Sequence, residues 1–210
     1  MSVYIHGGLR SPIGVLNGQY KHMRPEILGS QVIDEIINRY TISHIDGIFC
    51  GNAVGTGGNL GRLMGLMCNL PNSVPAITVD MQCASALMSI EIAYAHIVSG
   101  IMDSAIAGGI ESSSLQPERV YASGDDREGP YKVAQFTPQD QSPLAMLKGA
   151  ERTIHKYNVT KEDLYPHIIG SHQRASAALD NPYLQSYIMP ITIDGKRCID
   201  ECIRPTMNEK

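Results

Sequence analysis

The sequence predicts an α/β layered domain followed by a mostly helical lobe. Over residues 3–112, short runs typical of strands, either apolar or alternating between apolar and polar residues, alternate with segments whose apolar residues recur at helical spacing. The fourth such run, 104–112, is small and apolar, as in a buried parallel strand. After about residue 112 the chain becomes polar and loses its period, and two helical patterns follow near 143–158 and 161–180.

The first elements are marked by glycines and a proline. Residues 3–8, "VYIHGG", form a short apolar run ended by two glycines, which predicts a first strand. Residues 10–23 form a loop punctuated by glycine and proline. Pro25 suits the first position of a helix. We therefore predict a helix that begins at Pro25. The apolar face of this helix is expected to contain Leu28, Val32, Ile33, Ile36 and Ile37.

A second strand is predicted over 45–54, "IDGIFCGNAV", and a third over 75–82, where apolar and polar residues alternate. Between them, "GTGGNLGR" at 55–62 leads into a short helix. This stretch has no Gly-Lys-Ser/Thr ending and follows the second strand, so a tight turn is the better interpretation than a phosphate loop. In the lobe, 185–196 predicts an edge strand with an Asp-Gly turn.

Composition excludes several classes of protein. The chain has 210 residues, a net charge of −4 and 18% charged residues, which argues against a nucleic-acid partner. No apolar stretch approaches the ~20 residues that span a bilayer, and the N-terminus does not resemble a signal peptide. Five cysteines without framework spacing predict reduced thiols and a cytoplasmic location. The lack of a bilayer-spanning stretch predicts that no membrane is a partner.

Cys83 differs from the other cysteines in its position. Cys50 and Cys68 lie inside apolar elements, where packing is the expected role. Cys198 and Cys202 lack the partners of a zinc site, so no metal is expected. Cys83 stands where the third strand ends and a helix begins. Unpaired N–H groups at a helix start favour a thiolate and, later, an oxyanion.

The helix after Cys83 is apolar on almost every side and ends at Gly100. A sheet covers only one face of a helix, so another layer of protein should cover the opposite face. The scattered histidines have no spacing that marks a base for Cys83, and each is expected on the surface or in packing. The apolar positions of the helix after Cys83 are Leu87, Met88, Ile90, Ile92, Tyr94, Ala95, Ile97 and Val98.

Seven short motifs follow one another along the chain: "RSPIG", "GNAVGTGGNLGR", "QCASAL", "AGGIESSS", "MLKGAE", "SHQRASAA" and "DECIR". Their types and order resemble the N-terminal half of a thiolase, an acyl-CoA C-acyltransferase. The matches run from residue 3 to 204, with Cys83 at the nucleophile position and Arg62 at the arginine of the glycine segment. Two residues depart from the family pattern: Ala86 replaces a glycine, and Ala145 replaces a histidine.

The resemblance implies a fold and a site. It implies a mixed, mostly parallel sheet with helices on both faces in a core over 1–112, and an inserted lid lobe over 113–210. Cys83 would be the acyl-thioester nucleophile, with its backbone N–H as oxyanion donor, and Met146 would contact the pantetheine of CoA. Coenzyme A thioesters would be substrates, with no tightly bound cofactor.

The resemblance also implies that this chain alone is incomplete as a catalyst. The family's Gly-His-Pro histidine, Cys-x-Gly cysteine and Asn-Glu-x-Phe asparagine belong to a C-terminal half whose motifs are absent from these 210 residues. We therefore expect a homo-oligomer or a C-terminal thiolase half on another chain as partner. The alternative is a non-catalytic thiolase-like module that binds acyl-CoA or a protein partner.

Overall fold

A computed structural model describes residues 2–55, 57–135, 138, 142 and 144–208. Their contacts form two compact units, Met1–Gln116 with Asn181–Cys202, and Pro117–Asp180 with Ile203–Lys210. Each unit is described by itself. The core and lid boundaries expected from sequence, 1–112 and 113–210, remain a prediction about family organisation, because Asn181–Cys202 packs with the first unit.

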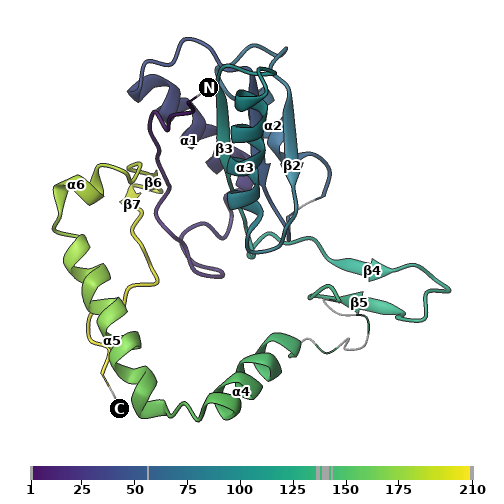
Figure 1. Cartoon of the computed structure of the whole chain (residues 1–210), viewed down its shortest axis with the longest axis vertical. Helices are drawn as coiled ribbons and strands as arrows, with labels where there is room; N and C mark the ends of the chain where they lie inside the picture. The colour runs from purple at the N-terminus through teal and green to yellow at the C-terminus, as the bar shows by residue number, and fades with distance from the viewer. Residues whose placement is uncertain (1, 56, 136–137, 139–141, 143, 209–210) are drawn as a thin grey trace. The chain divides into compact units, whose positions relative to one another are not determined.

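The elements follow the predicted order, with additions in the second half (Figure 1). The first unit contains α1 (Pro25–Arg39), β1 (Gly47–Gly51), α2 (Leu60–Met67), β2 (Ala76–Val79), α3 (Ser85–Val98), β3 (Ala105–Gly109), α6 (Pro182–Gln185), β6 (Thr192–Ile193) and β7 (Lys196–Arg197). The second contains β4 (Arg119–Tyr121), β5 (Gly129–Tyr131), α4 (Ala145–Tyr157) and α5 (Lys161–Ala178).

The main sheet is parallel, in the order β2-β1-β3. Every residue of β1 is buried, because this strand is central and helices cover both of its faces. Cys50 packs against Ile33 of α1 and Met64 of α2. Phe49 points to the opposite face, where its ring lies 5.1 Å from that of His96 on α3. The predicted α/β class and the three later strands are confirmed.

The prediction of a first strand over 3–8 is wrong. None of these residues is in a strand, and Tyr4 and Ile5 are 85% and 90% exposed. The segment is held through one side chain instead of a ladder. The Tyr40 hydroxyl donates to the Gly8 carbonyl oxygen at 3.3 Å, and its ring fills the space where a side chain at Gly7 would stand.

Two distant segments of the first unit are joined by charged side chains. Arg10 Nη1 and Nη2 donate to the two carboxylate oxygens of Asp200 at 2.8 and 2.7 Å. Asp200 Oδ1 also accepts from the Ile13 N–H at 2.7 Å, and Glu201 Oε2 accepts from the Val15 N–H at 2.9 Å. The hydrogen bonds from Arg10 lower the pKa of the Asp200 carboxyl.

An apolar cluster supports this junction. Leu28 of α1 packs with Met189, Ile191 and Cys198, all of which are buried. Burial raises the pKa of the Cys198 thiol. Cys198 therefore belongs to the core, although the sequence around it is polar. The predicted Asp-Gly turn lies next to it, where Asp194 and Gly195 have φ of 50° and 76° between β6 and β7.

The second unit contains the two predicted helices and a hairpin that the sequence did not indicate. Position 143, where the first helical pattern began, lies outside the described residues. α5 begins with a capping box, in which the Thr160 N–H donates to Asp163 Oδ2 at 2.8 Å. The β4–β5 hairpin is held by ring stacking of Tyr121 on Tyr131 at 4.2 Å. The described helices include none long and apolar enough to cross a membrane.

Two glycines let the start of α3 approach the sheet. Gly51 and Gly109 are paired at the carboxyl ends of β1 and β3. A Cβ at Gly51 would lie 2.5 Å from the Ala86 nitrogen, and one at Gly109 would lie 3.0 Å from the Ala86 Cβ. Ala86, which departs from the family glycine, is thus accommodated because Gly109 has no side chain. The helix start is fixed by backbone contact.

We expect Gly51→Ala to lower the free energy of unfolding by about 1–3 kcal/mol, because the methyl group overlaps the backbone of α3. The matched control is Gly108→Ala on β3, since a Cβ there meets no atom within 4 Å. We expect it to change stability by about 0.5 kcal/mol or less. Urea unfolding measures both. Equal midpoints for the two variants would contradict the close approach.

We expect Asp200→Asn to lower the free energy of unfolding at neutral pH by about 1–2 kcal/mol, moderated by solvent because Arg10 is 44% exposed. Since the folded-state pKa of Asp200 is lowered, this stabilisation is complete above its ordinary pKa of about 4 and is lost as pH falls through the lowered value. The gap between wild type and Asp200→Asn should narrow on acidification. A gap that widens or stays constant would refute the role of the ion pair.

Candidate active site around Cys83

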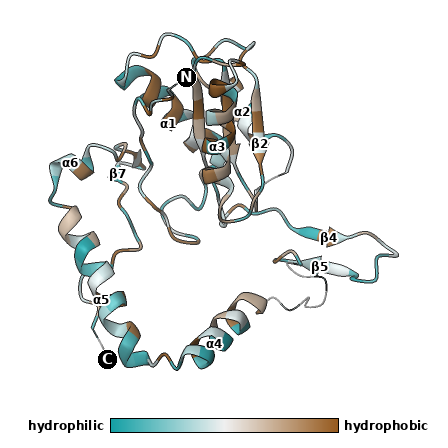
Figure 2. Cartoon of the chain, in the orientation of Figure 1, coloured by the Kyte–Doolittle hydropathy of each residue, from teal (hydrophilic) through white to brown (hydrophobic). Residues whose placement is uncertain are grey.

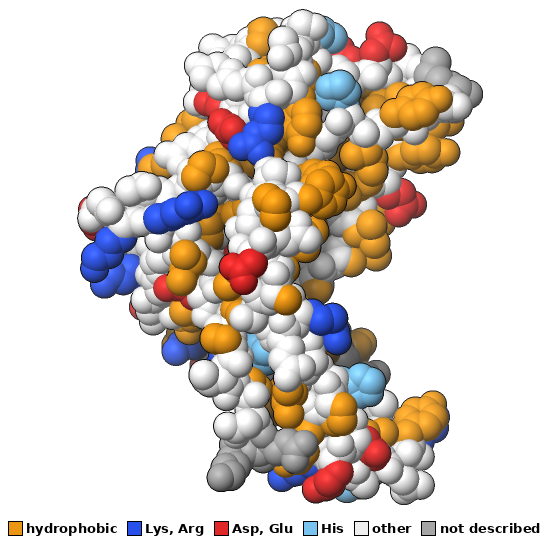
Figure 3. Space-filling model, turned by 90° about the vertical axis from the view of Figure 1, so that its left-hand side faces the viewer, with side chains coloured by type: hydrophobic (Ala, Val, Ile, Leu, Met, Phe, Trp, Pro, Cys, Tyr) orange, Lys and Arg blue, Asp and Glu red, His pale blue; other side chains and the backbone are white. Residues whose placement is uncertain are grey.

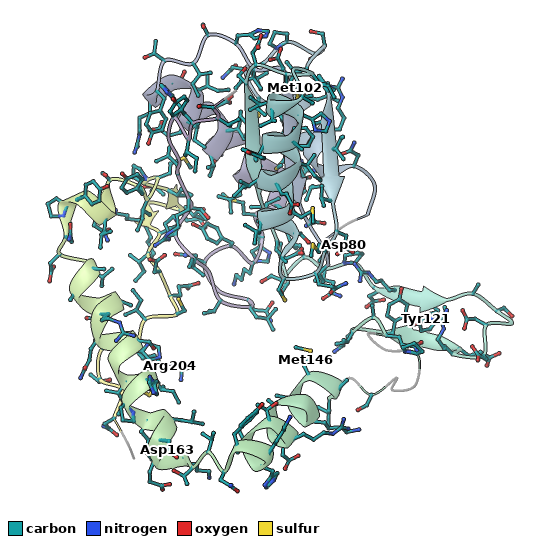
Figure 4. The ribbon with its side chains drawn as sticks, in the orientation of Figure 1. Asp80, Met102, Tyr121, Met146, Asp163 and Arg204 are labelled. Carbon is teal, nitrogen blue, oxygen red and sulfur yellow. The ribbon has the colours of Figure 1, made fainter. Side chains whose placement is uncertain are left out.

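Cys83 lies between the end of β2 and the start of α3, with an exposed side chain. Asp80 marks this edge of the sheet, beside the first turn of α3 (Figure 4). Ala84 is the N-cap residue, so Cys83 directly precedes the helix cap. The predicted strand–cysteine–helix junction is therefore present. A side chain there is next to the positive end of the helix dipole.

The turn that carries Cys83 has an unusual backbone. Gln82 adopts φ of +52°, the left-handed region that residues with a side chain rarely occupy. The Gln82 N–H donates to Asp80 Oδ1 at 2.9 Å. The Ser85 hydroxyl accepts from the Met81 N–H at 2.8 Å and donates to the Gln82 carbonyl oxygen at 2.6 Å. Cys83 is thus presented by a tight turn that neighbouring side chains hold.

Polar residues after β1 and β3 connect the ends of all three strands at this edge. The Asn52 N–H donates to the Val79 carbonyl oxygen at 3.0 Å, and Asn52 Nδ2 donates to the Ile110 carbonyl oxygen at 2.8 Å. Glu111 Oε2 accepts from the N–H groups of Ala53 and Val54 at 2.9 and 2.8 Å. Asn52 and Glu111 were not predicted as site residues from the sequence. Their position directly after strand ends was the available signal.

The cysteines differ in environment. Burial raises the pKa of Cys50 to about 11 and of Cys68 to about 12, so both are neutral thiols at physiological pH. These values agree with the packing role predicted for them. Cys202 is exposed like Cys83, but it does not precede a helix. Cys83 alone combines exposure with a helix start among the described cysteines.

Within the described part of the chain, no histidine hydrogen bonds to Cys83. The Nδ1 of His96 lies 2.9 Å from the Ile92 carbonyl oxygen, and its ring is tilted against the ring of Phe49. The described residues also contain no group of three or more potential metal ligands. The arrangement can hold a thiol at a helix start.

The glycine-rich stretch forms a helix cap and a turn. Gly57 and Gly58 have positive φ, and the Asn59 side chain accepts from the Arg62 N–H at 3.0 Å to cap α2. Arg62 then donates to the carbonyl oxygens of Val74 and Asn72 at 2.6 and 2.8 Å. These bonds fix the loop before β2. The turn interpretation is supported over residues 55 and 57–62, and Thr56 lies outside the described residues.

The face of α3 that points away from the sheet is open. Only Ser85, Ser89 and Ala93 of this helix are buried. Figure 2 shows the hydrophobic character of α3, and Figure 3 shows that hydrophobic side chains reach the surface of the unit that holds the sheet. The large exposed side chains of the helix are Leu87 (68%), Tyr94 (54%), Ile90 (46%) and Val98 (41%).

Met146 lies in the first turn of α4 and is 70% exposed (Figure 4). It belongs to the second unit, whereas Cys83 belongs to the first. Its contact with a CoA pantetheine therefore remains a prediction. Ala145, the residue that departs from the family histidine, is the first residue of α4.

Comparison with known proteins agrees with the motifs. The model of the family described as "Thiolase, N-terminal domain" matches residues 3–209. "Putative acetyl-CoA C-acetyltransferase VraB" of Staphylococcus aureus is 34% identical over 193 residues, covering 89% of this chain and 51% of that protein. The protein of the same name from Staphylococcus epidermidis is 32% identical over 213 residues, covering 96% and 54%.

A solved structure gives the same result. The crystal structure of the Bacillus anthracis acetyl-CoA acetyltransferase is similar with a TM-score of 0.81 and 25% identity, covering 97% of this chain and 55% of that one. The chain spans about half the length of the curated relatives it matches. The fold class expected from the sequence is thereby confirmed. With its sheet, its strand–cysteine–helix junction and its match over residues 3–209, this chain belongs to the thiolase family.

Proposed function

We propose that Cys83 accepts an acyl group from a coenzyme A thioester, as part of a thiolase-type acyl-CoA C-acyltransferase. The observation that carries this proposal is the exposed thiol on a tight turn at the start of α3. Family membership and the names of the relatives support it. A thiolate is a stronger nucleophile than a thiol, and a helix start favours it.

The proposed reaction has two stages. The Cys83 thiolate attacks the thioester carbonyl, the bond to the CoA sulfur breaks, and CoA leaves and takes up a proton. An acetyl-CoA then loses an α-proton to a base, and its carbanion attacks the acyl-cysteine to give a 3-ketoacyl-CoA and free Cys83. The reverse sequence is thiolysis. Condensation uses two thioesters and leaves one plus free CoA, whereas thiolysis breaks the new carbon–carbon bond and restores the second thioester.

The start of α3 supplies electrostatic assistance for the first stage. Attack on the thioester places negative charge on the carbonyl oxygen, and the Cys83 N–H is the proposed donor to it. One such donor lowers a barrier by about 3 kcal/mol. Because the contact of Ala86 with Gly51 fixes the helix start, this donor does not have to be ordered during the reaction.

The substrate and partners follow from the same site. We propose acyl-CoA as substrate, with Met146 at the pantetheine and no tightly bound cofactor. A C-terminal thiolase half, or a further copy of the chain, covers the apolar face of α3, on which Leu87 is 68% exposed. The base that removes the α-proton lies in that half. The chain alone is weakly active or inactive, and it acts in the cytoplasm.

The alternative is a thiolase-like module that binds acyl-CoA or a protein partner without chemistry. Its distinguishing feature would be a Cys83 that forms no acyl adduct. Because both functions use the same fold, binding of acyl-CoA does not separate them. Covalent transfer of the acyl group to Cys83 distinguishes the two functions.

We expect Cys83 to become acetylated when the full chain is incubated with acetyl-CoA, because it is the exposed thiol at a helix start. Intact-mass and peptide mass spectrometry detect the adduct and its position. Cys83→Ala should abolish it, whereas Cys202→Ala, which removes the other exposed thiol, should leave it unchanged. An adduct on Cys202, or none on Cys83, would favour the non-catalytic alternative.

We expect the chain alone to associate beyond its 22.9 kDa monomer mass, because the open apolar face of α3 is removed from water by contact. Replacing Leu87 and Tyr94 together by lysine should shift the mass towards the monomer. The control is Tyr183→Lys, since this side chain is 67% exposed on α6. Light scattering after size exclusion measures the mass. A wild-type monomer would contradict the expected cover of α3.

A further inference from the structure

The turn before Cys83 is held in an unfavourable conformation. Gln82 has φ of +52°, a region in which the Cβ of an ordinary residue crowds its own backbone. Glycine would occupy this region without that cost. The sequence has glutamine there, so other contacts must compensate for the strain. Because Cys83 is the next residue, the conformation of Gln82 sets the direction in which the thiol points.

Ser85 contacts both sides of this turn. Its hydroxyl accepts from the Met81 N–H, before the turn, and donates to the Gln82 carbonyl oxygen, within it. The residue is 5% exposed, so these bonds are shielded from water. Ser85 is also the first residue of α3. The Ser85 side chain therefore connects Met81, the left-handed Gln82 and the start of α3.

Asp80 holds the same turn from the solvent side. Its Oδ1 accepts from the Gln82 N–H at 2.9 Å, and the residue is exposed. This is an Asx-type turn, in which a short carboxylate bonds a backbone N–H two residues later. Ser85 and Asp80 thus bind the carbonyl oxygen and the N–H of the same residue, Gln82.

We propose that Ser85 and Asp80 are positioning residues for Cys83: together they keep Gln82 in the left-handed conformation and so fix the Gln82–Cys83 peptide, whose N–H is the proposed oxyanion donor. Neither is proposed to touch substrate. The inference rests on the proposed role of Cys83 as acyl acceptor. It adds that this role depends on a turn that two side chains impose.

Two reactions of the Cys83 thiol distinguish an effect on its placement from an effect on its exposure. Acylation by a small activated thioester, such as phenyl thioacetate, builds charge on a carbonyl oxygen and needs a donor beside the sulfur. Alkylation by iodoacetamide needs no such donor. The ratio of the acylation rate to the alkylation rate at Cys83 therefore reports the placement of the thiol. Because both reactions use the same thiolate, a change in its ionisation acts on both rates.

The experiment measures this ratio in the full chain by peptide mass spectrometry, with Cys202 changed to serine throughout. We expect Ser85→Ala to lower the ratio about tenfold, the factor that corresponds to releasing a left-handed residue, and Asp80→Ala to lower it less. Adding Gln82→Gly to Ser85→Ala should restore most of the ratio, because glycine keeps the turn without help. By itself, Gln82→Gly should change it little.

The matched control is Ser89→Ala, one helical turn further along α3. Ser89 is fully buried, and its hydroxyl lies 2.7 and 2.9 Å from the carbonyl oxygens of Ala86 and Gly108, so this variant also removes a buried hydroxyl from the helix. It does not touch the Gln82 turn. We expect it to lower the melting temperature and leave the ratio unchanged.

Each outcome decides the proposal. A ratio within about twofold of wild type in Ser85→Ala, an equal fall in Ser89→Ala, or no recovery on adding Gln82→Gly would overturn it while leaving the function of Cys83 intact. If Ser85→Ala does not fold, the exposed Asp80→Ala variant decides by the same criterion. A wild-type chain that is alkylated at Cys83 but never acylated would overturn the proposed function and this inference with it.

Discussion

The close approach of α3 to the glycines at the carboxyl ends of β1 and β3 is the constraint on which the site depends. Gly51 leaves room for the backbone of Ser85 and Ala86, and Gly109 leaves room for the Ala86 side chain. The helix therefore starts at one fixed height above the sheet. The short turn between Val79 and Ser85 must then be tight, which accounts for the left-handed Gln82 and for the exposed thiol after it.

Other contacts in the first unit stabilise the position of α3 on the sheet, but they leave the outer face of α3 exposed. Arg10 and Asp200 fasten the residues after β7 to the N-terminal loop, and Leu28 of α1 covers the apolar junction beside them. Asn52 and Glu111 connect the strand ends next to the Cys83 turn. By contrast, the outer face of α3 is uncovered within the described residues. The turn that carries Cys83 is therefore supported by the neighbouring strand ends, whereas the outer face of α3 has large exposed apolar side chains.

The sequence predicted what depends on local pattern and missed what depends on tertiary contact. The order of strands and helices around Cys83 followed from apolar period and from Pro25, because both act over a few residues. The strand expected over residues 3–8 does not form, because this segment pairs with no strand and contacts the Tyr40 side chain instead. The bonds of Glu111 could not be predicted, because they join segments after β1 and β3 that only the folded sheet brings together. The bonds of Ser85 are local, but they depend on the left-handed conformation of Gln82, which no sequence pattern marks.

The central claim is that the start of α3 presents Cys83 to a thioester carbonyl. The most direct measurement is a crystal structure of the chain after reaction with a thioester. We expect an acyl group on Cys83 Sγ, with its carbonyl oxygen within hydrogen-bonding distance of the Cys83 N–H and with Gln82 still left-handed. An acyl group whose oxygen points away from α3, or an acylated chain in which the turn has unwound, would contradict the account.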